Sequence, residues 1–132
     1  MHSEKRAAPR AVGRLLLAYR VGGDAAGWLS GGRSAGPVHR PEPEMNFNHL
    51  GLAFDDAETC RDGNSLLLEM DLADLGVHRA VAEVVRVSRV PIDEWDEAGA
   101  THRIAVRIVA FAGGGEAAVR AYTARTLRKN AG

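Results

Sequence analysis

Alternation of apolar and polar residues runs through most of the chain and predicts β-strands. Residues 12–21 alternate well, and the more apolar set of positions is expected to face the core: Gly13, Leu15, Leu17, Tyr19 and Val21. Four further strands are expected over residues 50–54, 65–72, 78–90 and 101–112. The last two are long and are joined by an acidic loop, so we expect them to form an antiparallel hairpin.

The end of the chain departs from this pattern, because its apolar residues recur at helical spacing. Three glycines at 113–115 end the preceding strand, and the following segment is rich in alanine. This segment has an acid near its start and three basic residues near its end, which matches the helix dipole at both ends. We therefore expect a C-terminal helix over residues 115–129, with a modest apolar stripe that packs on the sheet.

The connection over residues 22–44 is rich in glycine and proline, which predicts a long, mobile loop. Trp28 and Leu29 are its apolar exceptions. They form either a short strand or hydrophobic tuck within the loop, or a flap that closes over a ligand. Residues 55–64 contain turn formers and predict a hairpin-like connection between the strands at 50–54 and 65–72.

Composition limits the class of protein. A chain of 132 residues with 45% hydrophobic content is long enough for one domain with a core of useful size. Cys60 is the only cysteine, so no internal disulfide can form, which fits a reducing compartment. The apolar run near the N-terminus is too short for a signal peptide, and no stretch approaches the roughly 18–20 apolar residues of a membrane span. We expect a cytoplasmic protein without membrane insertion.

The charges cancel overall but are unevenly distributed. The chain has 17 basic and 17 acidic residues. Residues 4–20 are mostly basic, whereas residues 41–74 hold nine acids and one base, Arg61. This asymmetry indicates either an anion site near the N-terminus or a solvated charged face.

The residues provide no recognisable catalytic set. The five histidines form no pair with metal-ligand spacing, no serine or cysteine has the context of a nucleophile, and the glycine-rich segments lack the lysine of a phosphate loop. With 5% aromatic content, few aromatic residues are available to stack on single-stranded nucleic acid. We therefore expect no enzyme activity, no metal site and no nucleic-acid partner.

Two short signals remain. Arg6 and Arg10 lie around Pro9, which disfavours helix before it, so both arginines are expected on an extended arm that could converge on one ligand. A guanidinium group can pair bidentately with guanine or phosphate and can stack on a purine. The second signal is a polar turn that contains Asn46, Asn48 and Gly51 and runs directly into a strand.

Together these signals resemble the PilZ domain, which carries RxxxR before its first strand and a (D/N)xSxxG turn later. Arg6 and Arg10 match the first motif, and Asn46 and Gly51 match the second. Asn48 stands where the family usually has serine. The resemblance covers nearly the whole chain and implies a mainly β fold, a six-stranded antiparallel β-barrel with a C-terminal α-helix. The expected parts are a basic ligand-binding arm (1–11), the barrel (12–112, with the long loop 22–44) and the helix (115–129).

PilZ domains typically bind cyclic di-GMP, so the resemblance implies a receptor for this nucleotide. The implied contacts are Arg6, Arg10, Asn46, Asn48 and Gly51, with no other cofactor. Binding is expected to order the arm on the barrel and to change the surface offered to an effector protein. Asn48 leaves two outcomes open, because an amide larger than serine either crowds the ligand or makes its own contact. The alternative function is a PilZ-like adaptor that acts through protein contacts without binding the nucleotide.

Overall fold

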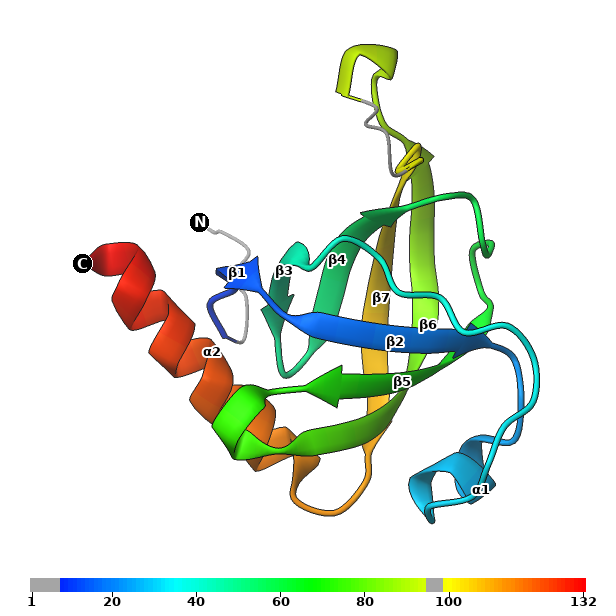
Figure 1. Cartoon of the computed structure of the whole chain (residues 1–132), viewed down its shortest axis with the longest axis horizontal. Coiled ribbons are helices and arrows are strands. Elements are labelled where there is room, and N and C mark those ends of the chain that lie inside the picture. The colour runs from blue at the N-terminus through cyan, green and yellow to red at the C-terminus, as the bar shows by residue number, and fades with distance from the viewer. Residues whose placement is uncertain (1–7, 95–98) are drawn as a thin grey trace, which may run out of the picture.

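The structure, a computed structural model, describes residues 8–94 and 99–132. Its main feature is a curled antiparallel sheet of seven strands in the order β1-β3-β4-β7-β6-β5-β2 (Figure 1). The strands are β1 (Ala11–Arg14), β2 (Leu16–Val21), β3 (Glu44–Asn48), β4 (Gly51–Asp56), β5 (Ser65–Asp71), β6 (Val77–Arg89) and β7 (His102–Phe111). The helices are α1 (Ala25–Leu29) and α2 (Gly115–Ala131), with short 3₁₀ turns at Ala73–Leu75 and Ile92–Glu94.

The two edge strands of the sheet come from one stretch of chain. β1 pairs with β3, and β2 pairs with β5, yet only Leu15 separates β1 from β2. Leu15 is fully buried, and its amide donates a hydrogen bond to the carbonyl of Pro43 (2.9 Å). The strand predicted over residues 12–21 is therefore two strands, because the chain changes partner at Leu15 and so joins both edges of the curled sheet.

The interior of the sheet is filled by the inward-facing side chains of every strand. As the alternation predicted, Leu15, Leu17 and Tyr19 are buried, at 0, 4 and 1% exposure. Val21 was expected in the same set but is 38% exposed, because it lies at the end of β2. The core contains large apolar residues from six strands, among them Phe47, Leu52, Phe54, Leu68, Met70, Val84 and Ile104.

The expected mainly β fold with a C-terminal helix is confirmed, and the β6–β7 hairpin is as predicted. The sheet has seven strands, whereas the family resemblance implied six and the alternation alone indicated five. The two strands that the alternation missed come from the break at Leu15 and from β3. The hairpin-like connection predicted over residues 55–64 is wrong. β4 lies between β3 and β7, whereas β5 lies between β6 and β2, so residues 57–64 cross from one part of the sheet to another.

The glycine- and proline-rich connection contains the short helix α1, which the sequence did not predict. Asp24 caps α1 by accepting a hydrogen bond from the amide of Gly27 (3.1 Å). Trp28 is buried against the outer face of the sheet, and its indole N–H donates to the carbonyl of Leu68 (3.0 Å). The Arg79 guanidinium stacks on the Trp28 ring at 3.7 Å. The hydrophobic tuck is thus confirmed, but in a helix and not in a strand.

Helix α2 packs beside β1 on the side of the sheet away from α1 (Figure 1). The Tyr122 ring lies 5.6 Å from that of Phe47, and its hydroxyl donates to the carbonyl of Arg14 (2.5 Å). Near the end of the helix, the Asn130 amide donates to the carbonyl of Val12 (3.1 Å) and accepts from its N–H (3.4 Å). Among the described residues, no helix is long and apolar enough to cross a membrane.

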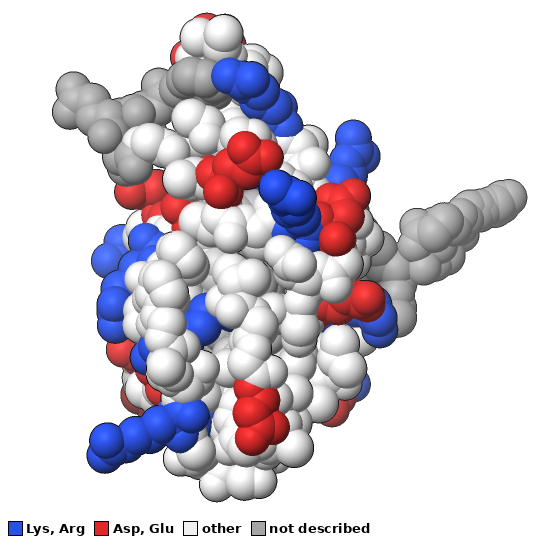
Figure 2. All heavy atoms as spheres, turned by 90° about the vertical axis from the view of Figure 1, so that its right-hand side faces the viewer, with Lys and Arg blue, Asp and Glu red and all other residues white. Residues whose placement is uncertain are grey.

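Charged residues of both signs are mixed on the face shown in Figure 2. Lys and Arg side chains lie beside Asp and Glu over its upper part, and uncharged atoms cover much of the rest. Among the described residues, oppositely charged side chains also form ion pairs, including Arg107 with Glu83 and Arg103 with Asp55. The described residues on this face therefore form no continuous basic surface of the kind that tracks a nucleic-acid backbone.

Candidate functional site

The residues of the two sequence motifs lie at one edge of the sheet, except that Arg6 is outside the described residues. Arg10 is exposed and directly precedes β1, and Asn46 and Asn48 lie on β3. β1 pairs with β3 so that Ala11 is opposite Phe47. Extending this register by one residue puts Arg10 across from Asn48. Segments almost forty residues apart in sequence are thus brought side by side.

The outer face of β3 carries the polar part of the second motif. Met45 and Phe47 point into the core, whereas Asn46 between them is exposed. Asn46 pairs with Val12, which is 55% exposed on the same outer face. Because side chains alternate along a strand, Arg10 belongs to the same face as Val12. The chain therefore presents the Arg10 guanidinium, from the residue before β1, and the exposed Asn46 amide, from β3, on one face.

Asn48 is the best-anchored polar side chain of this region. It is only 2% exposed. Its Oδ1 accepts hydrogen bonds from the amides of Leu50 (2.8 Å) and Gly51 (3.1 Å), which closes the turn between β3 and β4. Its Nδ2 donates to the carbonyls of Ala8 (3.2 Å) and Pro9 (3.4 Å). Asn48 therefore fixes the arm to the turn, and both its donor and its acceptor sides are already used within the chain.

Gly51 is required for close packing rather than for turn geometry. It is buried at the start of β4, and its φ is not in the left-handed region. A Cβ at this position would clash with the carbonyl oxygen of Val106 on β7. Gly51 was expected to allow the turn, but the structure indicates that the close approach of β7 excludes a side chain here.

The sheet next to Asn46 is low in relief and bordered by two ion pairs. Asn46 is followed across the sheet by Ala53 and Ala105, whose short side chains leave a shallow strip. On one side Arg103 forms two hydrogen bonds to Asp55 (2.8 and 3.0 Å), which raise the pKa of Arg103. On the other side Arg107 pairs with Glu83. These arginines belong to no sequence motif, and only the strand register brings them to the site.

A cleft of about 160 Å³ adjoins the same region on the side of α2. Asn48 contributes to it, and so do the arm, the turn and four residues of the helix. Its lining consists of Ala8, Pro9, Asn48, His49, Arg120, Thr123, Ala124 and Leu127. His49, in the turn between β3 and β4, is half-buried at this cleft. The helix was not expected to take part in the site.

A separate polar cluster lies inside the sheet. The Tyr19 hydroxyl donates to Asp56 (2.7 Å) and lies 2.6 Å from the Thr59 hydroxyl. Burial raises the pKa of Tyr19 and also that of the neighbouring Cys60 thiol, which is 5% exposed. Asp55 and Asp56 bond to different partners, Arg103 and Tyr19, because neighbouring side chains on a strand point to opposite faces. Burial in this cluster therefore favours the protonated forms of the Tyr19 hydroxyl and the Cys60 thiol.

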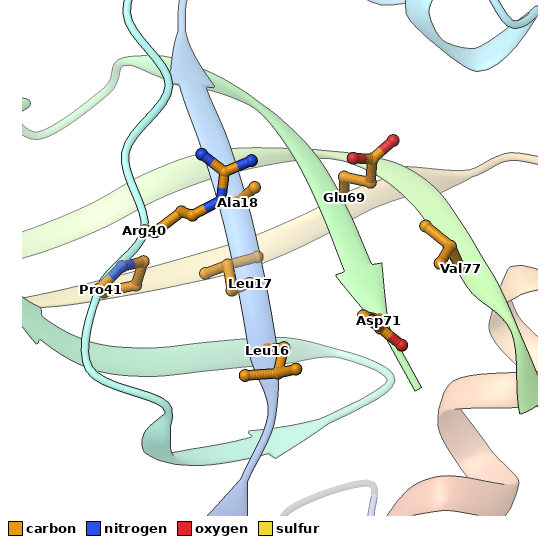
Figure 3. Close-up of a pocket in the computed structure, with 8 residues that line it drawn as sticks. All are labelled: Leu16, Leu17, Ala18, Arg40, Pro41, Glu69, Asp71 and Val77. Carbon is orange, nitrogen blue, oxygen red and sulfur yellow. The ribbon is translucent and has the colours of Figure 1, made fainter. Parts of the chain in front are cut away.

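Another groove, of about 310 Å³, lies over β2 and β5 (Figure 3). Its floor is formed by Leu16, Leu17 and Ala18, and its charged residues are Arg40, Glu69 and Asp71. One guanidinium and two carboxylates give this groove no excess positive charge. It shares no lining residue with the cleft beside α2. The groove therefore offers no net electrostatic attraction to an anionic ligand.

The curled antiparallel sheet, closed by its first stretch and packed against a C-terminal helix, is the fold of PilZ domains. The PilZ domain of YcgR from Escherichia coli, whose structure was solved with c-di-GMP, matches with a TM-score of 0.65 at 12% identity. The match covers 96% of this chain and 95% of that one. The inhibitor of motility MotI/DgrA from Bacillus subtilis matches with a TM-score of 0.69 at 17% identity, over 96% of this chain.

This chain spans about half of the MotI/DgrA chain, 53% of its length. Neither a protein-family model nor a curated protein sequence matches the chain. The expected resemblance to PilZ domains is therefore confirmed at the level of the fold.

Proposed function

We propose that the protein is a cytoplasmic receptor for cyclic di-GMP that binds the nucleotide between its arm and the outer face of β3 and β4. The observation that carries this proposal is the pair of hydrogen bonds from Asn48 to the carbonyls of Ala8 and Pro9. They hold the end of the arm, which leads into β1, beside the second motif, so Arg10 is available next to Asn46. The structure of the YcgR PilZ domain with c-di-GMP supports the choice of ligand.

Each site residue has a distinct role in this proposal. Arg10, together with Arg6, pairs with guanine or phosphate through its planar guanidinium group. Asn46 offers an exposed donor and acceptor from β3. Asn48 positions the arm, and Gly51 keeps β4 close to β7 so that the surface beside Asn46 stays flat. Arg107 and Arg103 add positive potential at the border, although each is neutralised in part by its carboxylate partner.

The receptor has no catalysis of its own in this proposal. Its output is a change of surface, because a nucleotide that engages both the arm and the sheet stabilises one arrangement of the arm over others. An effector protein that contacts the arm or the neighbouring end of α2 would then distinguish the bound from the free form.

Calorimetric titration of the full chain with cyclic di-GMP tests the proposal. Saturable binding is expected, with much weaker binding of cyclic di-AMP. The two nucleotides share a sugar–phosphate ring and differ in the base, so the comparison isolates the guanine contact of arginine. If neither nucleotide binds, the receptor function is wrong.

The alternative is an adaptor that acts through protein contacts alone. One observation favours it: the Asn48 amide, at the position where the family usually has serine, makes its hydrogen bonds within the chain. A chain that does not bind cyclic di-GMP but keeps its arm on β3 would fit this alternative. The titration above separates the two functions.

A further inference from the structure

Thr123 on α2 carries a polar group without a partner. The residue is 6% exposed, and its hydroxyl oxygen has no hydrogen-bond partner among residues 8–94 and 99–132. Thr126, one turn further along, donates its hydroxyl to the carbonyl of Tyr122 (3.0 Å). A buried hydroxyl without a hydrogen bond is costly, and most native structures satisfy such groups. The Thr123 hydroxyl therefore indicates a missing partner.

The place of Thr123 in the molecule suggests what that partner is. Thr123 lines the cleft of about 160 Å³ between the arm, the turn after Asn48 and α2. The walls are mostly apolar, with Ala8 and Pro9 from the arm and Ala124 and Leu127 from the helix. A cavity of about 150 Å³ is known to hold one benzene ring. This cleft therefore has room for a planar ring that presents an edge acceptor to Thr123.

Arg120 adds a cationic group at the same cleft. Its Nε and Nη2 atoms bond to Glu116 (3.2 and 3.1 Å), and its side chain is 59% exposed. The remaining N–H groups of the guanidinium can still donate. An apolar ring slot next to an exposed cation matches a nucleotide, whose base is planar and whose phosphate is anionic.

The cleft is continuous with the site proposed above, because Asn48 borders both. A ligand held by Arg10 and Asn46 can extend past the arm into the cleft. Cyclic di-GMP has two guanine bases, so one base can lie on the outer face of β3 and β4 while another enters beside α2.

We propose that this cleft is a second base-binding subsite, in which the Thr123 hydroxyl donates a hydrogen bond to the base and Arg120 lies near the phosphate. This inference rests on the proposed receptor function and adds α2 to the site. It also makes Thr123 a residue that lowers the stability of the free protein while it increases affinity for the nucleotide.

The test compares Thr123→Val, which removes the hydroxyl at nearly constant shape, with Thr123→Ser, which keeps it. Thr126→Val is the matched control, because it makes the same change on the same helix away from the cleft. We expect Thr123→Val to raise the Kd for cyclic di-GMP about 3- to 10-fold and to leave the melting temperature equal or higher. Thr123→Ser and Thr126→Val should bind like the parent.

The outcomes separate the subsite from the receptor function. If the parent binds the nucleotide and Thr123→Val binds equally well, the subsite is wrong while the receptor function stands. If Thr123→Val loses affinity but is also less stable, and Thr123→Ser does not restore binding, the residue is structural and the subsite is again wrong. If the parent does not bind cyclic di-GMP, the receptor function is wrong and the subsite with it.

Discussion

Asn48 donates a hydrogen bond from its side-chain amide to the main-chain carbonyl of Ala8, 3.2 Å away and 40 residues earlier in the sequence. The same amide group also reaches the carbonyl of Pro9. A serine at this position has a single hydroxyl hydrogen and a shorter side chain, so it could not make the same contacts to the turn and to the arm. The asparagine that departs from the family pattern therefore holds Ala8 and Pro9, the described residues of the arm that it contacts, against the turn after β3.

Replacing Asn48 by serine is expected to release the arm and to weaken cyclic di-GMP binding. The arm would then be ordered only on binding, and the conformational entropy lost in ordering it would weaken the affinity. We expect a loss of about 0.5–1.5 kcal/mol, the usual net value of a hydrogen bond. Calorimetry measures the affinity, and amide exchange at residues 10–12 should become faster in the free variant.

Asn46→Ala is the reference for this experiment. Because the Asn46 side chain is exposed, this variant should lose only a ligand contact. The opposite result for Asn48→Ser, tighter binding, would support the hypothesis that the larger amide crowds the ligand. Unchanged affinity with unchanged exchange would show that the contacts to Ala8 and Pro9 do not position the arm.

Arg10→Ala is expected to weaken cyclic di-GMP binding by about 1.5–3 kcal/mol, one to two decades in affinity, because the contact is charge-assisted. The melting temperature should not change, since the Arg10 side chain is exposed and precedes β1. Arg6→Ala is predicted to act in the same way. Arg33→Ala provides a control for the loss of one positive charge, since Arg33 is exposed in the connection after α1. Parent-like binding by both arm variants would rule out the arginine clamp.

Gly51→Ala is expected to destabilise the fold by about 1–3 kcal/mol, the usual cost of overpacking. The added methyl group would meet the carbonyl of Val106 and push β4 away from β7. Chemical unfolding measures the effect. Gly114→Ala is a suitable control, because no atom lies within 4 Å of a Cβ at that position and its φ is −87°. A neutral Gly51→Ala would mean that the strands can separate at no cost.

Stability is expected to fall at alkaline pH because of Cys60. Burial raises the pKa of its thiol in the folded state, whereas the pKa of a thiol in the unfolded chain is about 8.5. Below that pH the thiol is protonated in both the folded and the unfolded state, so its contribution to the free energy of unfolding is fully present. Above it the unfolded chain loses the proton first, so the free energy of unfolding declines by at most about 1.4 kcal/mol per pH unit, until the folded thiol ionises too.

Unfolding curves at a series of pH values from neutral upward check this prediction. Cys60→Ala should remove the decline that begins near pH 8.5 and leave a later one, because burial also raises the pKa of Tyr19. If parent and variant lose stability in parallel from the same pH, ionisation of Cys60 is not the cause.

The sequence was sufficient to predict the strands whose residues alternate and the terminal helix. It failed where tertiary contacts override local pattern. The break at Leu15 has no local signal, because Leu15 continues the alternation and the change of partner depends on Pro43. α1 was hidden among glycines, and its position depends on the packing of Trp28 against Leu67 and Val81.

The sequence indicated only some residues of the candidate site, because tertiary contacts determine which other residues lie near them. Two motifs indicated Arg10, Asn46, Asn48 and Gly51, and the structure brings them to one edge of the sheet. The role of Asn48 could not be predicted, since it depends on carbonyl groups that any residue could supply. Arg107 and Thr123 carry no motif. Their relation to the site follows from strand register in one case and from the packing of α2 in the other.

The single stretch that forms both edge strands also affects how the protein can fail. Until residues 11–21 pair with β3 and β5, both of those strands have an unpaired edge, and unpaired edges recruit other chains. β5 lies more than forty residues after β2 in the sequence, so the pairing of β2 with β5 that closes the sheet is a late, long-range step of folding. Cleavage near Leu15 would separate the two edge strands, and the expected consequence is aggregation through the exposed edges of β3 and β5 rather than a trimmed, soluble domain.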